Sequence, residues 1–175
     1  MFEQPWKYLT ELNAVRIIPN DNSLIHQGKG FTHSNNHTVA NGANLDHLLI
    51  TPPDVDVHLR LWKLKANDGP CTINAYEDTV VSANGTVEAV GNNNRQSVIT
   101  PRMGVYLAPT ITSIGNQLED NFIGSTGGGA HITVGESAES QVEWLLKKNT
   151  KYLLRINNGS GVSTRIHIRL FWYEI

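Results

Sequence analysis

The sequence predicts an all-β fold, an antiparallel β-sandwich with jelly-roll-like connections, on three observations. The last two dozen residues alternate between apolar and polar side chains, which is typical of strands with one buried face. Similar short segments recur along the chain, separated by turn signals of Gly, Asn and Pro. Only 17% of the residues are charged and 39% are hydrophobic, a balance that disfavours coiled coils and long helices.

The end of the chain is interpreted as a closing β-hairpin. Residues 152–157 form its first arm, with Tyr152, Leu154 and Ile156 on one side. The turn 158–161, Asn-Gly-Ser-Gly, precedes the second arm. The apolar side of this second arm carries Ile166, Ile168, Leu170 and Trp172. We expect these side chains to belong to the core.

The middle of the chain supplies further strands. Residues 48–51 form a candidate strand that a Pro-Pro pair ends. Apolar residues then occupy odd positions from Val55 to Leu61 and even positions at Trp62 and Leu64. This switch predicts a bulge, a strand end or burial on both sides. A turn at 68–70 leads into a returning strand, which is interpreted as a second hairpin.

Later segments are shorter. Strands are expected near 98–100 and 105–108, after a polar run at 91–95 that is interpreted as a mobile loop. Residues 137–148 fit either a helix or a strand, and we favour the strand because a turn then leads directly into the closing hairpin.

Two regions differ in character. Residues 1–44 are an irregular mixture of aromatics, prolines and three of the seven histidines, with a fourth, His47, close behind, and are predicted as an N-terminal arm. Residues 45–175 are predicted as the sandwich domain. The single cysteine, Cys71, cannot form an internal disulfide and is expected to be buried. No signal peptide or membrane-spanning segment is recognised, so we expect a soluble protein made in a cytoplasm.

Charge and motifs argue against several functions. A net charge of −2 gives no general attraction to nucleic acid or to anionic membranes. His33 and His37 have the spacing at which a helix aligns metal ligands, but the residues between them favour a turn, so solvated loop histidines are expected. Glu136, Glu139 and Glu143, or Asp54 and Asp56, could form a glycosidase pair, although solvated carboxylates are commoner. We expect no catalysis, no metal and no cofactor.

The outward face of the closing hairpin is a candidate interface, because arginine beside aromatic residues is enriched at protein interfaces. A solvated face, on which arginine stems cover apolar surface, is an equal alternative. Aromatic residues of the arm could also order upon a neighbour. The candidate interface residues are Trp6, Tyr8, Phe31, Arg155, Arg165 and Arg169.

The pattern of residues 45–175 resembles small virion proteins of tailed bacteriophages, of the capsid decoration or head-stabilising type. The resemblance rests on Asn-Thr-Lys-Tyr-Leu-Leu-Arg-Ile-Asn-Asn at 149–158 and Ile-His-Ile-Arg-Leu-Phe-Trp-Tyr-Glu at 166–174. Leu-Arg-Leu at 59–61, Ala-Tyr-Glu at 75–77, Asn-Asn-Asn-Arg at 92–95 and Pro-Thr-Ile-Thr at 109–112 also fit. It implies a sandwich that binds the outside of an assembled head, with the major capsid protein as its partner. It also implies a homo-oligomer, for which we favour a trimer over a dimer, located in the virion.

A rival function is a carbohydrate-binding or receptor-binding module of a head or tail fibre. Sugar-binding sandwiches display aromatic platforms and amide side chains at loop tips. Trp62, Tyr106 and residues 92–94 could serve in this way, although core packing is the simpler interpretation of Trp62. An enzyme of unfamiliar kind is a third, disfavoured possibility.

Overall fold

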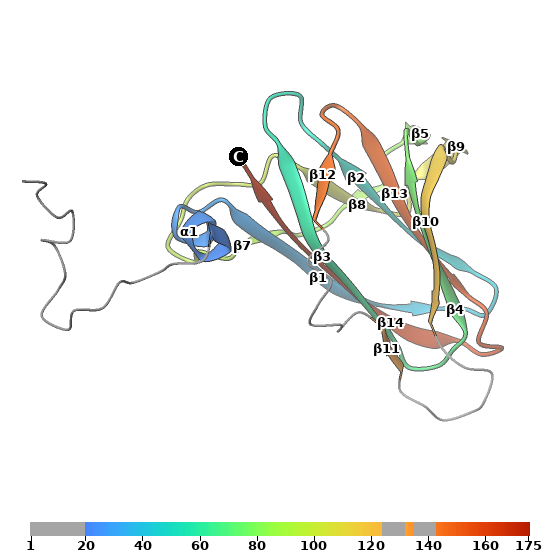
Figure 1. Cartoon of the computed structure of the whole chain (residues 1–175). Helices are drawn as coiled ribbons and strands as arrows, with labels where there is room; N and C mark the ends of the chain where they lie inside the picture. Colours follow the sequence, from blue (N-terminus) through green and yellow to red (C-terminus); the bar gives the residue numbers. More distant parts are fainter. Residues whose placement is uncertain (1–19, 124–131, 135–142) are drawn as a thin grey trace, which may run out of the picture.

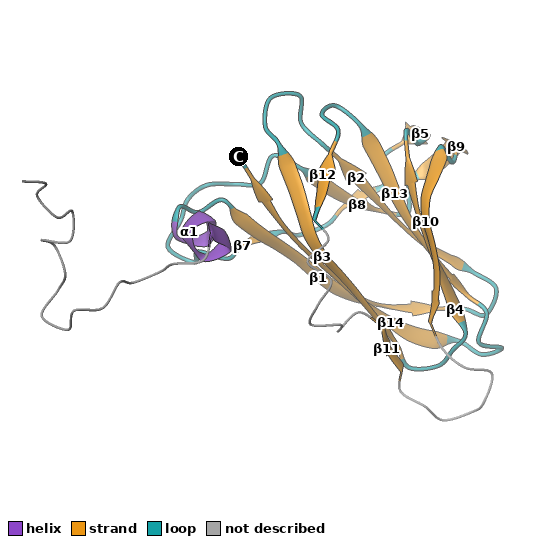
Figure 2. Ribbon diagram, in the orientation of Figure 1, coloured by secondary structure: helices purple, strands orange, loops and turns teal. Residues whose placement is uncertain are grey.

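The computed structural model describes residues 20–123, 132–134 and 143–175, and nearly all of its elements are strands (Figures 1 and 2). Two six-stranded antiparallel sheets face each other. Sheet A has the order β11-β3-β14-β1-β7, and β12 also pairs with β3. Sheet B has the order β10-β4-β13-β2-β8-β6. The predicted all-β sandwich is confirmed, while the jelly-roll arrangement of its connections stays a prediction.

The bounds of the elements are as follows. Sheet A consists of β1 (Gly30–Val39), β3 (Val57–Ala66), β7 (Gly91–Asn92), β11 (Ile132–Val134), β12 (Trp144–Leu146) and β14 (Thr164–Glu174). Sheet B consists of β2 (Asn44–Ile50), β4 (Cys71–Glu77), β6 (Thr86–Val87), β8 (Gly104–Leu107), β10 (Asn116–Ile123) and β13 (Lys151–Asn158). A separate ribbon pairs β5 (Val80–Ala83) with β9 (Thr110–Ser113), and the helix α1 (Asn20–His26) precedes β1. No helix in the described part of the chain has the length and apolar character needed to cross a membrane.

The core lies between the sheets. Each long strand turns alternate apolar side chains inward, and the inner faces interdigitate as in other sandwiches. Sheet A contributes Phe31, Leu64, Ile166, Ile168, Leu170 and Trp172, whereas sheet B contributes Leu45, Leu49, Ile73, Ala75, Leu154 and Ile156. The predicted core residues at the chain end and Cys71 are all buried.

The prediction of a closing hairpin is wrong about strand pairing, although its alternation of buried and exposed side chains is confirmed. Strand β13 pairs with β2 and β4 in sheet B, whereas β14 pairs with β1 and β3 in sheet A. The connection after Asn158 therefore carries the chain from one sheet to the facing one. The second predicted hairpin is wrong for the same reason, because β3 and β4 belong to different sheets.

Three such crossings meet at one end of the sandwich. They are the segments 40–43, 67–70 and 159–163, and main-chain hydrogen bonds tie them together. The Gly42 N–H donates to the Asn158 carbonyl at 2.6 Å, and the Gly159 N–H donates to the Pro70 carbonyl at 3.0 Å. These bonds fix the positions of the strand ends that carry the candidate site described below.

The N-terminal boundary also needs correction. Residues 30–39 were predicted as part of an irregular arm, but they form β1, which pairs with β14 along its whole length. The sandwich therefore begins before residue 45. The strand expected near 98–100 is absent, since these described residues form an irregular connection to β8.

The switch of apolar positions in β3 is confirmed as a bulge. The register between β3 and β14 shifts where Phe171 and Trp172 face Leu61 and Leu59. Arg60 is therefore the additional residue on β3, and the strand keeps one face inward on both sides of it. At 144–146 the predicted strand is likewise found, as β12.

Candidate functional site

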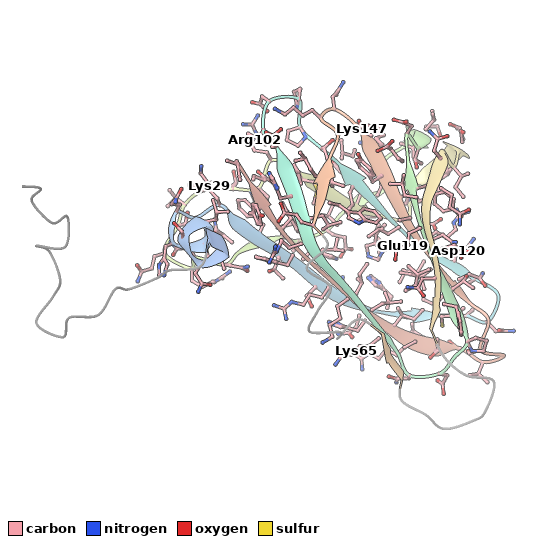
Figure 3. All side chains as sticks on the ribbon, viewed as in Figure 1. Lys29, Lys65, Arg102, Glu119, Asp120 and Lys147 are labelled. Atoms are coloured by element: carbon pink, nitrogen blue, oxygen red, sulfur yellow. The ribbon has the colours of Figure 1, made fainter. Side chains whose placement is uncertain are left out.

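The outer face of sheet A carries a row of basic side chains. Arg165 and Arg169 alternate with the buried Ile166 and Ile168 on β14, so they point away from the core. The neighbouring strand β3 adds lysines in register, because Lys63 is paired with Arg169 and Lys65 with His167. We call Lys63, Lys65, Arg165 and Arg169 the cationic face; Lys65 is labelled on β3 near its end in Figure 3.

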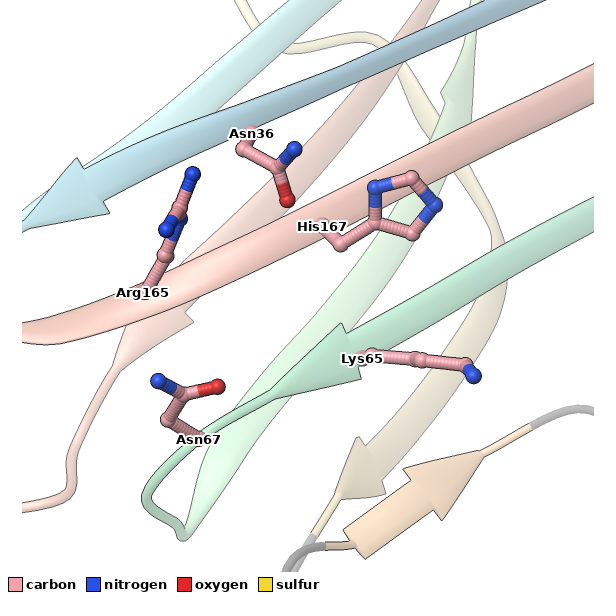
Figure 4. Close-up of a pocket in the computed structure, with 5 residues that line it drawn as sticks. All are labelled: Asn36, Lys65, Asn67, Arg165 and His167. Carbon is pink, nitrogen blue, oxygen red and sulfur yellow. The ribbon is translucent and has the colours of Figure 1, made fainter.

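A hollow lies at the end of this face, close to the three crossings. Its volume is about 440 Å³, and it opens to solvent. Side chains from β1, β3, β14 and the turn after β3 surround it (Figure 4). The lining residues are Asn36, Lys65, Asn67, Arg165 and His167. A main-chain hydrogen bond of 3.0 Å from the Asn67 N–H to the Arg165 carbonyl holds two sides of the hollow together.

Positive charge dominates the electrostatics here. Burial lowers the pKa of His167, and Lys65, Arg169 and Lys63 lower it further, while a hydrogen bond to the Asn35 main chain opposes them. Within the described segments, no acidic side chain forms an ion pair with Lys65, Arg165 or Arg169. The carboxylate of Asp68, which follows Asn67, accepts a hydrogen bond from the Thr164 hydroxyl at 3.0 Å.

The predicted interface residues separate into four groups, of which Arg155 is described in the next paragraph. Arg165 and Arg169 share one exposed face as expected. Phe31 does not reach the surface: it is 1% exposed and packs on Trp172 with ring centroids 6.0 Å apart. Its assignment to an irregular arm was wrong because β1 is an inner strand of sheet A. Trp6 and Tyr8 lie outside the described residues.

Arg155 lies on the other sheet. It belongs to β13, and its guanidinium forms two hydrogen bonds of 2.8 Å with the carboxylate of Asp46 on β2. The prediction that Arg155 shares a face with Arg165 and Arg169 is therefore wrong, because the chain crosses between the sheets after Asn158. Asp46 satisfies the charge of Arg155 within the protein.

A cluster of histidines occupies the interior instead of a solvated loop. His33 and His37 face inward from β1, and His47 faces them from β2, with ring centroids 5.8 and 5.3 Å from His47. The predicted turn between His33 and His37 is wrong because pairing with β14 holds these residues in a strand. His33 and His47 are at most 1% exposed.

Burial lowers the pKa of two of these imidazoles, His37 and His47. Burial, followed by repulsion from His33 and His37, lowers the pKa of His47 to about 3. Both ring nitrogens of His47 and the Nε2 atoms of His33 and His37 lack a hydrogen-bond partner among the described residues. Four strand residues span about 13 Å, so His33 and His37 stand too far apart to share a tetrahedral ion with His47. Accordingly, no set of three metal-ligating side chains is assembled in the described part of the chain.

Glu143 is the centre of a separate polar network on sheet A. Its carboxylate accepts hydrogen bonds from His58, Tyr173 and Arg60, and the rings of His58 and Tyr173 stack at 4.8 Å. Burial alone would raise the pKa of Glu143, but the hydrogen bonds from Tyr173 and His58 outweigh it and lower the pKa. A carboxylate held ionised by these donors anchors the start of β12 to β3 and β14. Its proposed partners Glu136 and Glu139 lie outside the described residues.

The other acidic pair is engaged in separate contacts. The Asp54 carboxylate forms a salt bridge with Arg102 at 2.8 Å, and the Asp56 carboxylate forms one with Lys148 at 2.9 Å. Both pairs are about half exposed. Asp54 and Asp56 are therefore solvated carboxylates, the commoner alternative named in the sequence analysis, and each forms an ion pair at the surface.

The predicted sugar platform is not assembled by the described residues. Tyr106 is on β8 in sheet B, whereas Asn92 is on β7 in sheet A. The Asn92 amide donates to the carbonyls of Gly28 and Ile99 at 2.7 and 2.9 Å. The loop predicted to be mobile is thus fastened by its own side chains. The side chain of Trp62 is not among those described.

Five residues of the site are absent from the candidate interface residues of the sequence analysis: Lys63, Lys65, Asn36, Asn67 and His167. The alternation of Lys63 and Lys65 with Leu64 and Ala66 is visible in the sequence. It could have identified the lysines if β3 had been placed next to β14.

No protein-family model matches the chain, and a search of curated proteins finds no match either.

Proposed function

We propose that this chain is a noncatalytic structural protein of a phage virion that binds the outer surface of the capsid and stabilises the head lattice. The observation that carries the proposal is the cationic face, where Lys65, Arg165 and Arg169 form no ion pair with a described residue. We further propose the major capsid protein as the partner, contacted through its acidic residues.

Physical reasoning supports a partner for this face. Like charges close together on neighbouring strands repel, and Lys65, which pairs with His167, lies diagonally between Arg165 and Arg169. An acidic surface would turn this repulsion into attraction and would also accelerate association. A capsid lattice repeats the same contact many times, so a symmetric oligomer of this chain, for which we favour a trimer, gains avidity from modest contacts.

The test removes the two arginines. A variant with Arg165→Ser and Arg169→Ser is compared with wild type by co-sedimentation with empty heads at low and high salt. We expect at least a tenfold loss of binding at low salt, because charged contacts contribute most there. Wild-type binding should weaken as salt rises.

A control keeps the change in net charge equal. Lys147→Ser with Lys148→Ser also removes two positive charges, but from the exposed connection between β12 and β13. This control should bind heads nearly as well as wild type. Equal losses in the two variants, or unchanged binding after loss of both arginines, would refute docking through the cationic face.

The hollow favours a second candidate function, a carbohydrate-binding or receptor-binding module of a head or tail fibre. Asn36, Asn67 and His167 present amide and imidazole groups at an open surface, and such groups bind sugar hydroxyls. A glycan array distinguishes the two functions. Specific, saturable glycan binding without co-sedimentation with heads would favour this candidate over decoration.

A further inference from the structure

The hollow beside the cationic face combines two side chains of formal positive charge with uncharged polar side chains. The charged forms of arginine and lysine carry only N–H donors. The amides of Asn36 and Asn67 add N–H groups, and His167 adds an imidazole (Figure 4). These side chains come from the three neighbouring strands β1, β14 and β3 and from the turn that follows β3. The arrangement is therefore a rim of donors around one open space.

We propose that this hollow binds a doubly charged tetrahedral oxyanion, the phosphate group of a phosphate monoester carried by a larger molecule. Two side chains with a formal positive charge line the hollow, and a dianion neutralises both. A phosphate monoester offers three acceptor oxygens to the N–H donors of Lys65, Arg165 and the two asparagine amides, whereas a carboxylate offers two. Arginine is particularly suited to such groups because its planar fork binds two oxygens at once.

The size of the hollow fits a carried group better than a free ion. At about 440 Å³ it lies in the range of small-molecule sites and leaves room for the atoms next to the phosphate. This ligand differs from the carboxylates of an acidic capsid surface. A site for it extends the proposed function to a second kind of ligand, and its test requires no capsid.

His167 provides the measurement, because its imidazole lines the hollow and because burial, together with the nearby Lys65 and Arg169, lowers its pKa. A bound dianion must raise that pKa, since the anion stabilises the protonated ring. The imidazole resonances of the full chain are followed by NMR through a pH titration in sodium sulfate and in sodium chloride of equal ionic strength. Sulfate stays dianionic over the whole range, and a His167→Gln variant assigns the resonance.

We expect sulfate to raise the pKa of His167 and to shift its resonance saturably. Arg165→Gln and Lys65→Gln should each weaken the apparent sulfate affinity by about tenfold, as loss of a charge-assisted hydrogen bond does. Lys147→Gln should leave it unchanged. His26, exposed at the end of α1, is an internal reference for non-specific effects of salt.

Further probes define the ligand class. Inorganic phosphate should raise the pKa of His167 and shift its resonance saturably as sulfate does, while acetate should not. The proposal is overturned if sulfate shifts the resonances of His167 and His26 alike, or if acetate binds as tightly as sulfate. It is also overturned if Arg165→Gln and Lys65→Gln both bind sulfate as tightly as wild type. If the protein binds sulfate but does not bind heads, the proposed decoration function is refuted and the anion site is not. If it binds heads but does not bind sulfate, the anion site is refuted and the decoration function is not.

Discussion

Asn158 is the residue at which the three crossings are fastened. It is fully buried, and its side-chain amide donates to the carbonyls of Val39 and Val162 at 2.8 Å each. Its side-chain oxygen accepts from the Ser160 N–H at 3.0 Å. A residue that appears in the sequence as the first member of a turn thus joins the ends of β1 and β13 to the start of β14.

Replacement of Asn158 by Ala should lower the free energy of unfolding by at least about 2 kcal/mol, because buried main-chain groups then lose their partners. Urea denaturation measures this. Asn74→Ala is the control, since Asn74 bonds to Asp120 at the surface, and it should cost about 0.5 kcal/mol or less. Similar costs for the two variants would show that Asn158 does not fasten the crossings.

The buried histidines predict sensitivity to acid. Burial lowers the pKa of His47 to about 3. Burial also lowers the pKa of His37; the carboxylate of Glu88 raises it, and His33 lowers it further. In the unfolded chain both return to about 6.5, so the unfolded chain binds more protons below that pH. The free energy of unfolding should therefore fall by up to roughly 1.4 kcal/mol per pH unit for each such histidine below pH 6.5. For His47 this loss continues to about pH 3.

Urea titrations between pH 7.5 and 4 test this expectation. His47→Leu should flatten the pH dependence, because a neutral side chain then replaces the titrating one. His26→Leu alters an exposed histidine and should keep the wild-type slope. A His47→Leu variant with the wild-type slope would contradict the assignment of acid sensitivity to the buried cluster.

At the scale of elements, a glycine, Gly115, allows the close approach of the ribbon β5–β9 to sheet B, and Gly161 in the crossing 159–163 provides a comparison. Gly115 has a φ of +87°, and a Cβ atom there would lie 2.1 Å from the Glu77 carbonyl oxygen. Gly161 has a φ of +86°, but a Cβ atom there would have no neighbour within 4 Å. The two positions share a backbone conformation and differ in the space around it.

Replacing each of these two glycines by Ala should separate the cost of the left-handed backbone conformation from the cost of a steric clash with the neighbouring main chain. Gly161→Ala should cost about 1 kcal/mol from the left-handed conformation alone. Gly115→Ala should cost more than about 2 kcal/mol, because the main chain at Glu77 must also move. Thermal and urea unfolding measure both variants. Equal costs would mean that the ribbon can move away from β4 without loss.

Alternation predicted the buried face of nearly every long strand, but it could not predict which strands pair. Alternation of apolar and polar side chains indicates that a strand has one buried face. It is the same whether the next strand along the chain lies in the same sheet or in the facing sheet. A four- or five-residue connection can reverse within a sheet or cross about 10 Å to the other sheet. The connections at 67–70 and 159–163 cross, so both predicted hairpins were wrong while their core residues were right.

The site was predicted in part for the same reason. Arg165 and Arg169 could be placed on one outward face because they lie on a single strand. Lys65 and Asn36 reach the hollow only through pairing of β3 and β1 with β14, over about a hundred positions of sequence. Local patterns carry no information on such distant pairings, which depend on how the whole core closes.

At the scale of the molecule, the two sheets present different outer surfaces. Sheet B pairs Arg155 with Asp46 on its outer face, and Lys147 with Glu77 at 2.5 Å. Sheet A instead gathers the cationic face and the hollow around β14. With a net charge of only −2, the protein has no general field to direct association. The orientation of this molecule on a partner is therefore expected to follow the local charge of sheet A.

Electron microscopy of the assembled particle tests this account most directly. We predict density for the sandwich on the capsid lattice, with the outer face of sheet A and residues Arg165 and Arg169 directed at acidic residues of the capsid protein. Density located at the tail, or density on the lattice that contacts the capsid through sheet B, would contradict it.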